Sequence, residues 1–436
     1  MIDNNTFKTR RQALIQLLPE NCVAIIAGAT EQTRNNDVEF PFRQTSDFYY
    51  LTGFEEPDAF LVLCPKRSDG ETILFVRPKD KNMEIWNGYR AGPEGAIQDY
   101  LADEAFEVEQ IDEIVPNLMF DCRSVYASFG QNPDFDQHIM HWVNQVKSHA
   151  RKGVSAPTQF NDISNLIHEM RLIKSDAEIE QLRKAAQISA QAHHIAMQQC
   201  NDGVMEYQLD AHINFHSKMN GSKREAYSSI VGSGNNACIL HYVSNDQPIK
   251  NGDLVLIDAG CEYNYYAADI TRTFPANGKF SKEQATLYQL VLDAQSAALA
   301  EVKPGNLYNA PHQAAVKILT HGLVDLGLLT GDVNKLVEDE AYKTYYMHNT
   351  GHWLGMDVHD AGRYKIDGKW REFKPGMVIT IEPGLYVALD NEQAPIEYRG
   401  IGIRIEDDIV ITETGYDVLS KDCVKEIKDV EAMCQS

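Results

Sequence analysis

Closely spaced cysteines are missing from this sequence, although it contains eight cysteines in 436 residues. No C-x-x-C motif occurs, and the cysteines are scattered from position 22 to position 434. Zinc ribbons, thioredoxin-like sites and disulfide scaffolds depend on such spacing, so the sequence disfavours all three. Reduced and mostly buried thiols, as in a cytoplasmic protein, are the expected alternative.

Long hydrophobic runs and excess basic charge are absent as well. The longest apolar stretch, at residues 22–29, falls far short of the roughly 20 residues that a membrane-spanning helix needs, and the first residues do not resemble a secretory signal. Lys and Arg number 40 against 63 Asp and Glu, a net charge of −23. Because such a surface repels nucleic acid and anionic membranes, neither is an expected partner.

The chain is long enough for two or three domains, since single cores rarely exceed about 250–300 residues. Residues 1–158 alternate helix-like and strand-like segments, which predicts an N-terminal α/β domain. Its predicted elements are helices at 6–18 and 134–147 and short buried strands at 23–27, 59–64 and 72–76. Small, basic and turn-forming residues at 148–159 predict a linker.

Residues 159–174 are interpreted as linker and the start of a second domain, which occupies residues 175–436. Ser175 with Glu178 and Ser281 with Gln284 form capping boxes, and each predicts a helix beginning after the serine. Two more helices are predicted at 206–218 and 309–326, and β-forming segments predict strands at 254–260, 268–274, 377–384 and 400–412. This pattern indicates an α+β domain with a mixed sheet and helices on its outside.

An internal repeat links the two halves of this domain. The segment NGDLVLIDAG (residues 251–260) matches PGMVITIEPG (residues 375–384) without a gap. Each copy is a strand that ends in a carboxylate two residues before a glycine. Chance similarity of two glycine-bounded strands is the alternative, but the repeat predicts a pseudo-two-fold domain with a site between its halves.

The repeated strands carry carboxylates that should lie close together. With a turn centred on Tyr263 and Asn264, Asp258 is expected directly opposite Asp269, on a face that Leu254 and Leu256 mark as buried. Two facing buried carboxylates need a cation, a shared proton or several donors.

Further acidic groups and a cluster of histidines belong to the same domain. Glu382 ends the second copy of the strand, and Arg404 and Glu406 are expected to share one face of the strand at 400–412. The glycine-rich segment 347–360 adds His348, His352 and His359. Two divalent cations would neutralise four carboxylates, and oxygen-rich donors with one imidazole suit Mn²⁺, with Co²⁺ or Zn²⁺ as alternatives. Ion pairing with Arg272 and Arg404 is the other interpretation of the same residues.

Four segments carry a family resemblance: IDAG…ADITRTF, HNTGHWLGMDVHD, VITIEPGLY and GIRIEDDIVIT. They resemble the signature blocks of the metallopeptidases with the pita-bread fold, and most closely those of the bacterial aminopeptidase P branch. Residues 33–63 are similar to the N-terminal domain of that branch, and RLIKSDAEIEQLRKAA is similar to the start of its catalytic domain. The resemblance therefore covers nearly the whole chain, and no ligand position departs from the family pattern.

The resemblance implies a set of site residues. Asp258 matches a terminal ligand of one metal, Asp269 and Glu406 match bridging carboxylates, and His352 and Glu382 match the ligands that complete the second metal. The residues implied for substrate binding are His241, His348, His359, Tyr386, Arg404 and Trp86, the last reaching a neighbouring subunit. Glu382, His359, His241, His348 and Arg404 are implied in catalysis, with Glu382 as the proton shuttle.

The resemblance also implies an activity and its alternatives. The expected reaction removes the N-terminal residue from peptides with proline second, through a hydroxide bridging two divalent ions, in a cytoplasmic homotetramer built as a dimer of dimers. A prolidase limited to Xaa-Pro dipeptides shares all five ligands, and organophosphorus-ester hydrolysis is a known side activity of such enzymes. A non-catalytic binding protein or a metal-free amidinohydrolase on this scaffold is disfavoured because the ligand set is complete.

Overall fold

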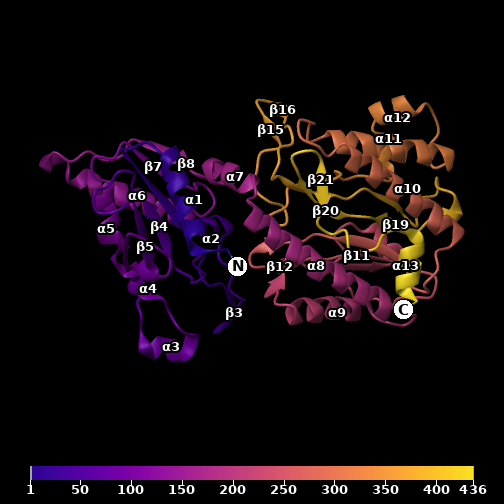
Figure 1. Ribbon diagram of the computed structural model, residues 1–436, viewed down its shortest axis with the longest axis horizontal. Coiled ribbons are helices and arrows are strands. Elements are labelled where there is room, and N and C mark those ends of the chain that lie inside the picture. The colour runs from indigo at the N-terminus through magenta and orange to yellow at the C-terminus, as the bar shows by residue number, and fades with distance from the viewer. Residues whose placement is uncertain (1, 436) are drawn as a thin grey trace. The chain divides into compact units, whose positions relative to one another are not determined.

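The computed structural model describes residues 2–435, which form two compact units, one ending at Arg171 and the other beginning at Leu172 (Figure 1). Among the described residues, no helix combines the length and the apolar character needed to cross a membrane. All eight cysteines have free thiols.

A six-stranded mixed sheet forms the centre of the N-terminal unit, in the order β6-β5-β4-β1-β7-β8. The strand β1 pairs antiparallel with β4 and parallel with β7, and β8 is the last strand on the β7 side. The strands of the sheet are β1 (Cys22–Ala27), β4 (Phe60–Leu63), β5 (Thr72–Val76), β6 (Glu104–Glu107), β7 (Ser124–Ala127) and β8 (Gln159–Asp162), beside a small hairpin of β2 (Thr33–Asn35) and β3 (Val38–Glu39).

Helices complete this unit, and they confirm the predicted α/β alternation. They are α1 (Asn4–Leu17), α2 (Ser46–Thr52), α3 (Lys81–Asn87), α4 (Gly92–Gln98), α5 (Ile111–Leu118), α6 (Pro133–Ser148) and α7 (Ser164–Leu172), which reaches the next unit. The buried side chains of β1 and β5 pack with Trp142 and Val143 of α6 in one apolar core. The N-terminal sheet thus takes in residues 159–162, because β8 hydrogen-bonds to β7.

In the C-terminal unit, α8 and α9 pack on the strands of the first half and α10 packs on those of the second (Figure 1). The capping boxes form as predicted: the Ser175 backbone N–H donates to Glu178 Oε2 over 3.0 Å, and that of Ser281 donates to Gln284 Oε1 over 2.8 Å. The helices are α8 (Asp176–Gln199), α9 (Glu206–Met219), α10 (Lys282–Ala300), α11 (Ala310–Asp325), α12 (Val333–Glu338) and α13 (Ile427–Cys434).

The strands between these helices form several small sheets rather than one mixed sheet. Their orders are β10-β11-β14, β13-β12-β9, β17-β20-β21, β18-β19 and β15-β16. The strands are β9 (Arg224–Glu225), β10 (Ile230–Ser233), β11 (Leu254–Asp258), β12 (Cys261–Tyr263), β13 (Tyr266–Ala267), β14 (Thr271–Pro275), β15 (Lys365–Ile366), β16 (Lys369–Trp370), β17 (Val378–Ile381), β18 (Gly384–Val387), β19 (Ile401–Arg404), β20 (Asp407–Ile411) and β21 (Tyr416–Val418).

The predicted internal repeat is present in this topology. The strands β11 and β17 are equivalent, because each is followed by an antiparallel pair (β12–β13 and β18–β19) and then by its own antiparallel partner, β14 or β20. The turns before them also match: Gly252 and Gly376 have φ of 91° and 85°, a region that favours glycine. The two halves thus present equivalent strand ends, at Asp258 and at Glu382.

Two details of the predicted strands are wrong. Asp258 pairs with Thr271 rather than with Asp269, because the turn centres on Asn264 and Tyr265, whose φ values of 49° and 70° suit a type I′ hairpin. A shift of two residues keeps the same side chains on the same face. The segment 400–412 is not one strand, since it breaks after Arg404 into β19 and β20, which belong to different sheets.

Candidate metal centre

A cavity of about 830 Å³ in the C-terminal unit is lined by the ends of these strands and by the segment 348–359. Its wall includes nearly all the residues that the sequence analysis expects in the site: Asp258, Asp269, Glu382, Glu406, Arg404, His241, His348, His352 and His359. Tyr386 lies just behind the wall, where its hydroxyl contacts Arg404 and His348.

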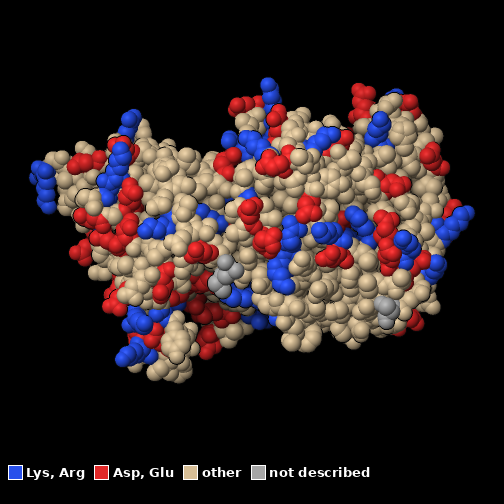
Figure 2. All heavy atoms as spheres, viewed as in Figure 1, with Lys and Arg blue, Asp and Glu red and all other residues tan. Residues whose placement is uncertain are grey.

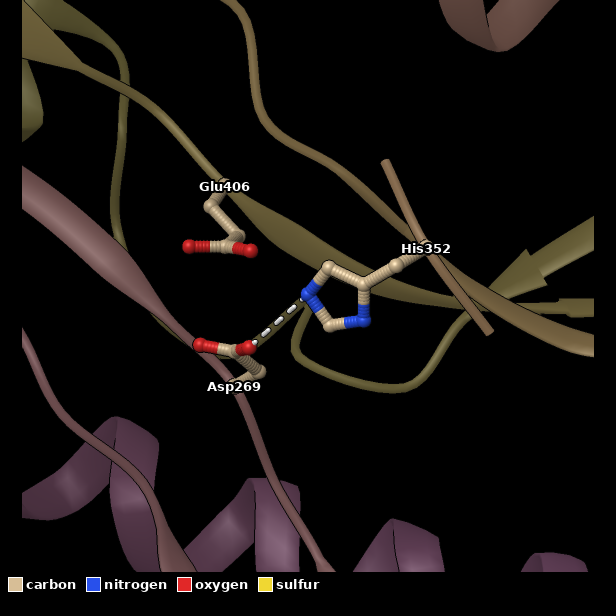
Figure 3. A group of neighbouring side chains, drawn as sticks. All are labelled: Asp269, His352 and Glu406. Carbon is tan, nitrogen blue, oxygen red and sulfur yellow. Dashed lines mark ion pairs between the residues drawn. The ribbon is translucent and has the colours of Figure 1, made fainter. Parts of the chain in front are cut away.

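Three side chains in this cavity are close enough to hold one metal ion. One ligand atom each from Asp269, His352 and Glu406 lies within 4.8 Å of the others (Figure 3). Figure 3 shows the two carboxylates and the imidazole pointing toward one another from separate segments of the chain. The His352 Nε2 atom is 3.3 Å from Asp269 Oδ2 and 3.8 Å from Glu382 Oε1.

The imidazole of His352 is oriented by the backbone. Its Nδ1 lies 3.0 Å from the Trp353 carbonyl oxygen, which accepts only if Nδ1 carries the proton. In the neutral imidazole, Nε2 then faces the carboxylates with its lone pair, the arrangement in which histidine ligates metals. Thr380 fixes the same residue from behind, because its Oγ1 accepts from the His352 backbone N–H over 3.1 Å.

Asp258 lies beside this group but has partners of its own. Its Oδ2 accepts from Arg404 Nη2 over 2.6 Å, and its Oδ1 is 2.5 Å from the Tyr227 hydroxyl. The same hydroxyl is 2.5 Å from Asp269 Oδ1. One hydroxyl proton cannot serve both carboxylates, so Tyr227 holds the two acidic groups close without neutralising them. Sequence analysis missed Tyr227, and a lone tyrosine 31 residues before Asp258 offers no motif that could have identified it.

The carboxylates crowd one another in a buried place. Burial, together with Asp258, raises the pKa of Asp269, and burial with Asp269 and Glu382 raises that of Glu406 well above its ordinary value. Burial also raises the pKa of Glu382 to about 7, although His352 and Arg404 act to lower it. The group therefore resists becoming fully anionic on its own.

His352 responds to these carboxylates in the opposite sense. Burial disfavours its charged form, but Asp269 and Glu382 outweigh burial and raise the pKa of His352 to about 9. The protein thus stabilises positive charge at the point where the imidazole meets the carboxylates. This fits a cation site, because oxygen donors with one imidazole are typical ligands of divalent metals.

Other hydrogen bonds hold the carboxylates in place. Thr271 Oγ1 donates to Glu406 Oε2 over 2.6 Å and accepts from Arg404 Nε over 3.1 Å. Arg272 donates to the Glu406 carbonyl oxygen over 2.6 Å from beneath the cavity. Such contacts to ligand side chains preorganise a metal site.

A second polar chain runs along the cavity wall from Asp258. Arg404 Nη1 donates to the Tyr386 hydroxyl over 2.9 Å, and that hydroxyl lies 2.8 Å from His348 Nε2. Burial and then Arg404 lower the pKa of His348 to about 3, so its imidazole is neutral. Burial and then His352 lower the pKa of His359, whose ring centroid is 4.2 Å from that of His352.

His241 lies on an exposed loop of the cavity rim. Trp86 belongs to α3 in the N-terminal unit and does not line this cavity; its side chain is 85% exposed. The structure therefore brings ten of the eleven expected site residues together within one unit.

Comparison with known proteins identifies the two units. Residues 180–413 match the model of metallopeptidase family M24, and residues 7–126 match that of the aminopeptidase P N-terminal domain. The chain belongs to metallopeptidase family M24. The expected fold, an α/β domain followed by a pita-bread domain with an internal repeat, is thereby confirmed.

Several relatives of this M24 metallopeptidase match it over almost their whole length. The Xaa-Pro aminopeptidase of Escherichia coli is 44% identical over 99% of this chain and 98% of its own. The structure of Pseudomonas aeruginosa aminopeptidase PepP has a TM-score of 0.99 at 49% identity, covering 100% of this chain and 98% of its own. Zinc-substituted E. coli aminopeptidase P in complex with product has a TM-score of 0.97 at 43% identity, with the same coverage.

Proposed function

We propose that this protein is a Xaa-Pro aminopeptidase, which removes the N-terminal residue from peptides that have proline in the second position. The carrying observation is the group formed by Asp269, His352 and Glu406 at one end of a cavity that also holds Asp258 and Glu382. The full-length likeness to enzymes named for this activity supports the substrate class. A bond before proline is a tertiary amide, which favours a dedicated site.

Two divalent ions are proposed as cofactors, with Mn²⁺ first and Co²⁺ or Zn²⁺ as alternatives. Asp258, Asp269, His352, Glu382 and Glu406 would hold them, and their oxygen-rich donor set with one oriented imidazole fits such ions. Bound there, the ions supply Lewis-acid polarisation of the scissile carbonyl and activation of water. The zinc-substituted relative supports a metal requirement but leaves the native ion to experiment.

The chain's own residues have distinct proposed roles around the ions. Glu382 holds and passes a proton at its carboxylate toward the proline nitrogen. His359 donates to the carbonyl oxygen as negative charge develops there, and His241 and His348 position that carbonyl. The free α-amine of the substrate is attracted to the carboxylate-rich end of the cavity, near Asp258.

Arg404 and Tyr386 are proposed to shape the pocket that receives proline. Their hydroxyl–guanidinium contact of 2.9 Å ties that pocket to Asp258, because the same arginine donates to Asp258 Oδ2. A change in the proline pocket is thereby coupled to the position of a metal ligand.

The N-terminal unit is proposed to mediate assembly into a homotetramer, a dimer of dimers, and to contribute to the rim of a neighbouring subunit's site. Three large side chains on and just after α3 support this, since Ile85, Trp86 and Tyr89 are 80%, 85% and 96% exposed. Exposed large apolar and aromatic side chains of this kind are typical of interfaces. Light scattering of the wild-type protein and of Trp86→Ala tests the proposal.

Free cysteines and an acidic surface suit the proposed peptide-cleaving enzyme of the cytoplasm. On the face shown in Figure 2, basic side chains are scattered among acidic ones. Fractionation of cells that express the protein tests the location.

A peptide-length series tests the activity. The purified protein, stripped with a chelator and reloaded with Mn²⁺, Co²⁺ or Zn²⁺, is assayed on Xaa-Pro, Xaa-Pro-Xaa-Xaa and Xaa-Ala-Xaa-Xaa. Release of the first residue from the longer proline peptide is the expected result. Cleavage of the dipeptide alone indicates a prolidase, and no metal-dependent cleavage of any peptide overturns the proposal.

A further inference from the structure

Glu206, the first residue of α9, has a carboxylate that the site described above does not use. Its side chain is fully buried, yet all its hydrogen-bond donors are uncharged. A buried carboxylate is costly unless donors saturate it, so its presence in the core of the unit calls for an explanation. The N-terminal end of a helix lowers that cost, because the helix dipole favours negative charge there.

The donors all come from one stretch, residues 233–247, referred to here as the rim segment. Ser233 donates to Oε1 with both its backbone N–H (2.8 Å) and its hydroxyl (2.7 Å), and Asn236 Nδ2 donates to the same oxygen over 3.1 Å. The Tyr242 hydroxyl and the Gln247 backbone N–H donate to Oε2 over 2.9 and 3.0 Å. Five hydrogen bonds thus fasten the beginning, middle and end of the rim segment to one carboxylate.

The rim segment carries His241 to the cavity. Leu240, His241 and Val243 line the cavity wall, and residues 239–246 form neither a helix nor a strand. Tyr242, which donates to Glu206, is the chain neighbour of His241. Asn245 fastens the same stretch to β10 through the Val231 N–H and the Ser229 carbonyl oxygen.

We infer that Glu206 is a positioning residue, whose carboxylate gathers the rim segment and so fixes His241 at the substrate-binding cavity. This inference rests on the proposed function for the role of His241, but the anchoring itself does not. A carboxylate is required because both of its oxygens accept hydrogen bonds, so that together they can bind all five donors. An amide in its place turns one acceptor into a donor, and at least two of the five bonds are lost.

Two variants test the inference with different severity. Glu206→Gln keeps the shape and removes an acceptor, whereas Tyr242→Phe removes a single donor and leaves the Glu206 side chain in place. Glu262→Gln is the matched control, a buried glutamate of the same unit that accepts from Arg224 Nη1 over 2.6 Å, away from the rim segment. Thermal unfolding and metal content are measured for each variant.

The first measurement is hydrogen exchange, which needs no turnover. Glu206→Gln should exchange faster across residues 236–247 while α10 is unchanged, and Tyr242→Phe should show a smaller effect at the same place. Glu262→Gln should leave the rim segment as in the wild type. Unaltered exchange of the rim segment in Glu206→Gln overturns the inference. This test does not depend on whether the proposed activity is correct.

The second measurement is a double-mutant cycle with His241→Ala on a Xaa-Pro-Xaa-Xaa peptide. Alone, Glu206→Gln should lower kcat/KM by about tenfold to a hundredfold, the size expected for a misplaced group, with metal content unchanged. In the His241→Ala background the same change should cost less than about twofold, because coupled residues are not additive. An equal loss in both backgrounds overturns the link to His241, whereas an inactive wild type overturns the proposed function instead.

Discussion

Glu406 and Asp407 are neighbours in the sequence, and both carboxyl groups are buried, yet their surroundings are opposite. Burial raises the pKa of Asp407, but Arg272 and Lys425, 2.7 and 2.6 Å away, outweigh it and hold that pKa far below its ordinary value. Burial raises the pKa of Glu406 too, and there the neighbouring Asp269 and Glu382 raise it further. One carboxylate is neutralised within the protein, and the other is left short of positive charge.

The difference separates a structural ion pair from a candidate metal ligand. Sequence alone left both interpretations open for these acidic residues, because arginines are plentiful nearby. In the structure Arg272 is committed to Asp407 and to backbone carbonyl groups, while Arg404 reaches Asp258 alone among the expected ligands. Among residues 2–435, Asp269, Glu382 and Glu406 form no ion pair with a lysine or arginine, and His352 pairs with the first two. A divalent ion bound there would balance the remaining negative charge.

The largest expected effect comes from Glu406→Gln. Loss of this carboxylate should abolish Mn²⁺-dependent turnover, because a proposed bridging ligand is removed. The metal-free variant should unfold at a temperature no lower than that of the metal-free wild type, since the amide relieves repulsion with Asp269. Initial rates and thermal unfolding in chelator check both parts, with Glu262→Gln as control. Normal turnover in the variant would falsify the ligand assignment.

Asp407→Asn should have the opposite effect to Glu406→Gln: it should destabilise the protein even when no metal is bound. It leaves Arg272 and Lys425 without their buried partner, so the free energy of unfolding should fall by about 3–5 kcal/mol. Urea denaturation of the metal-free protein measures this. A change below about 1 kcal/mol would mean that water or another carboxylate replaces Asp407, and the contrast with Glu406 would no longer hold.

The sequence predicted the local elements around these acidic residues but not all of their partners. The strands, the capping boxes at Ser175 and Ser281 and the internal repeat were predictable, because each depends on local periodicity or spacing. The pairing of Asp258 was not, because a hairpin turn placed one residue too early shifts the partner by two. A register shift of two residues does not move side chains to the other face of the strand, so the predicted acidic side chains still face the cavity.

The long-range partners were the other gap. Glu206 and Tyr227 act through contacts 27 to 42 residues away along the chain, with no motif at either end. In the segment IEDD, strand alternation and the family resemblance selected Glu406 as the site residue. They did not show what happens to Asp407, because its ion pairs are made with Arg272 and Lys425 from other segments of the chain.

Removing the metal should make stability depend on pH. Burial raises the folded-state pKa of Glu382 from 4.5 to about 7, so the folded protein binds its proton more tightly than the unfolded chain does. In chelator, Glu382 should therefore contribute a fall in the free energy of unfolding as pH rises from about 4.5 to 7, by about 3 kcal/mol at most. His348, whose pKa burial lowers to about 3, contributes in the opposite direction over the same range, so the Glu382 contribution is read as the difference between the wild type and Glu382→Gln. Asp407 adds no slope there, because its lowered pKa lies below this window.

The metal-loaded protein is the matched control for this titration. Bound cations favour the anionic carboxylates, so saturating Mn²⁺ should flatten or reverse the slope over the same range. Chemical denaturation at several pH values, with and without Mn²⁺, gives both curves. Identical slopes would mean that Glu382 does not sense the metal.

The smallest expected effect tests how the protein orients His352 rather than how it balances charge. Thr380→Val removes the hydroxyl that accepts from the His352 N–H, but keeps the backbone bond from Thr380 N to the His352 carbonyl. Mn²⁺ affinity should fall by about tenfold, the low end for contacts behind a ligand. Thr320→Val is the control, since Thr320 is equally buried and its hydroxyl donates only to the Val316 carbonyl within α11. Equal affinities of the two variants, measured by calorimetry, would show that the backbone alone holds the imidazole, and that charge rather than orientation sets metal binding here.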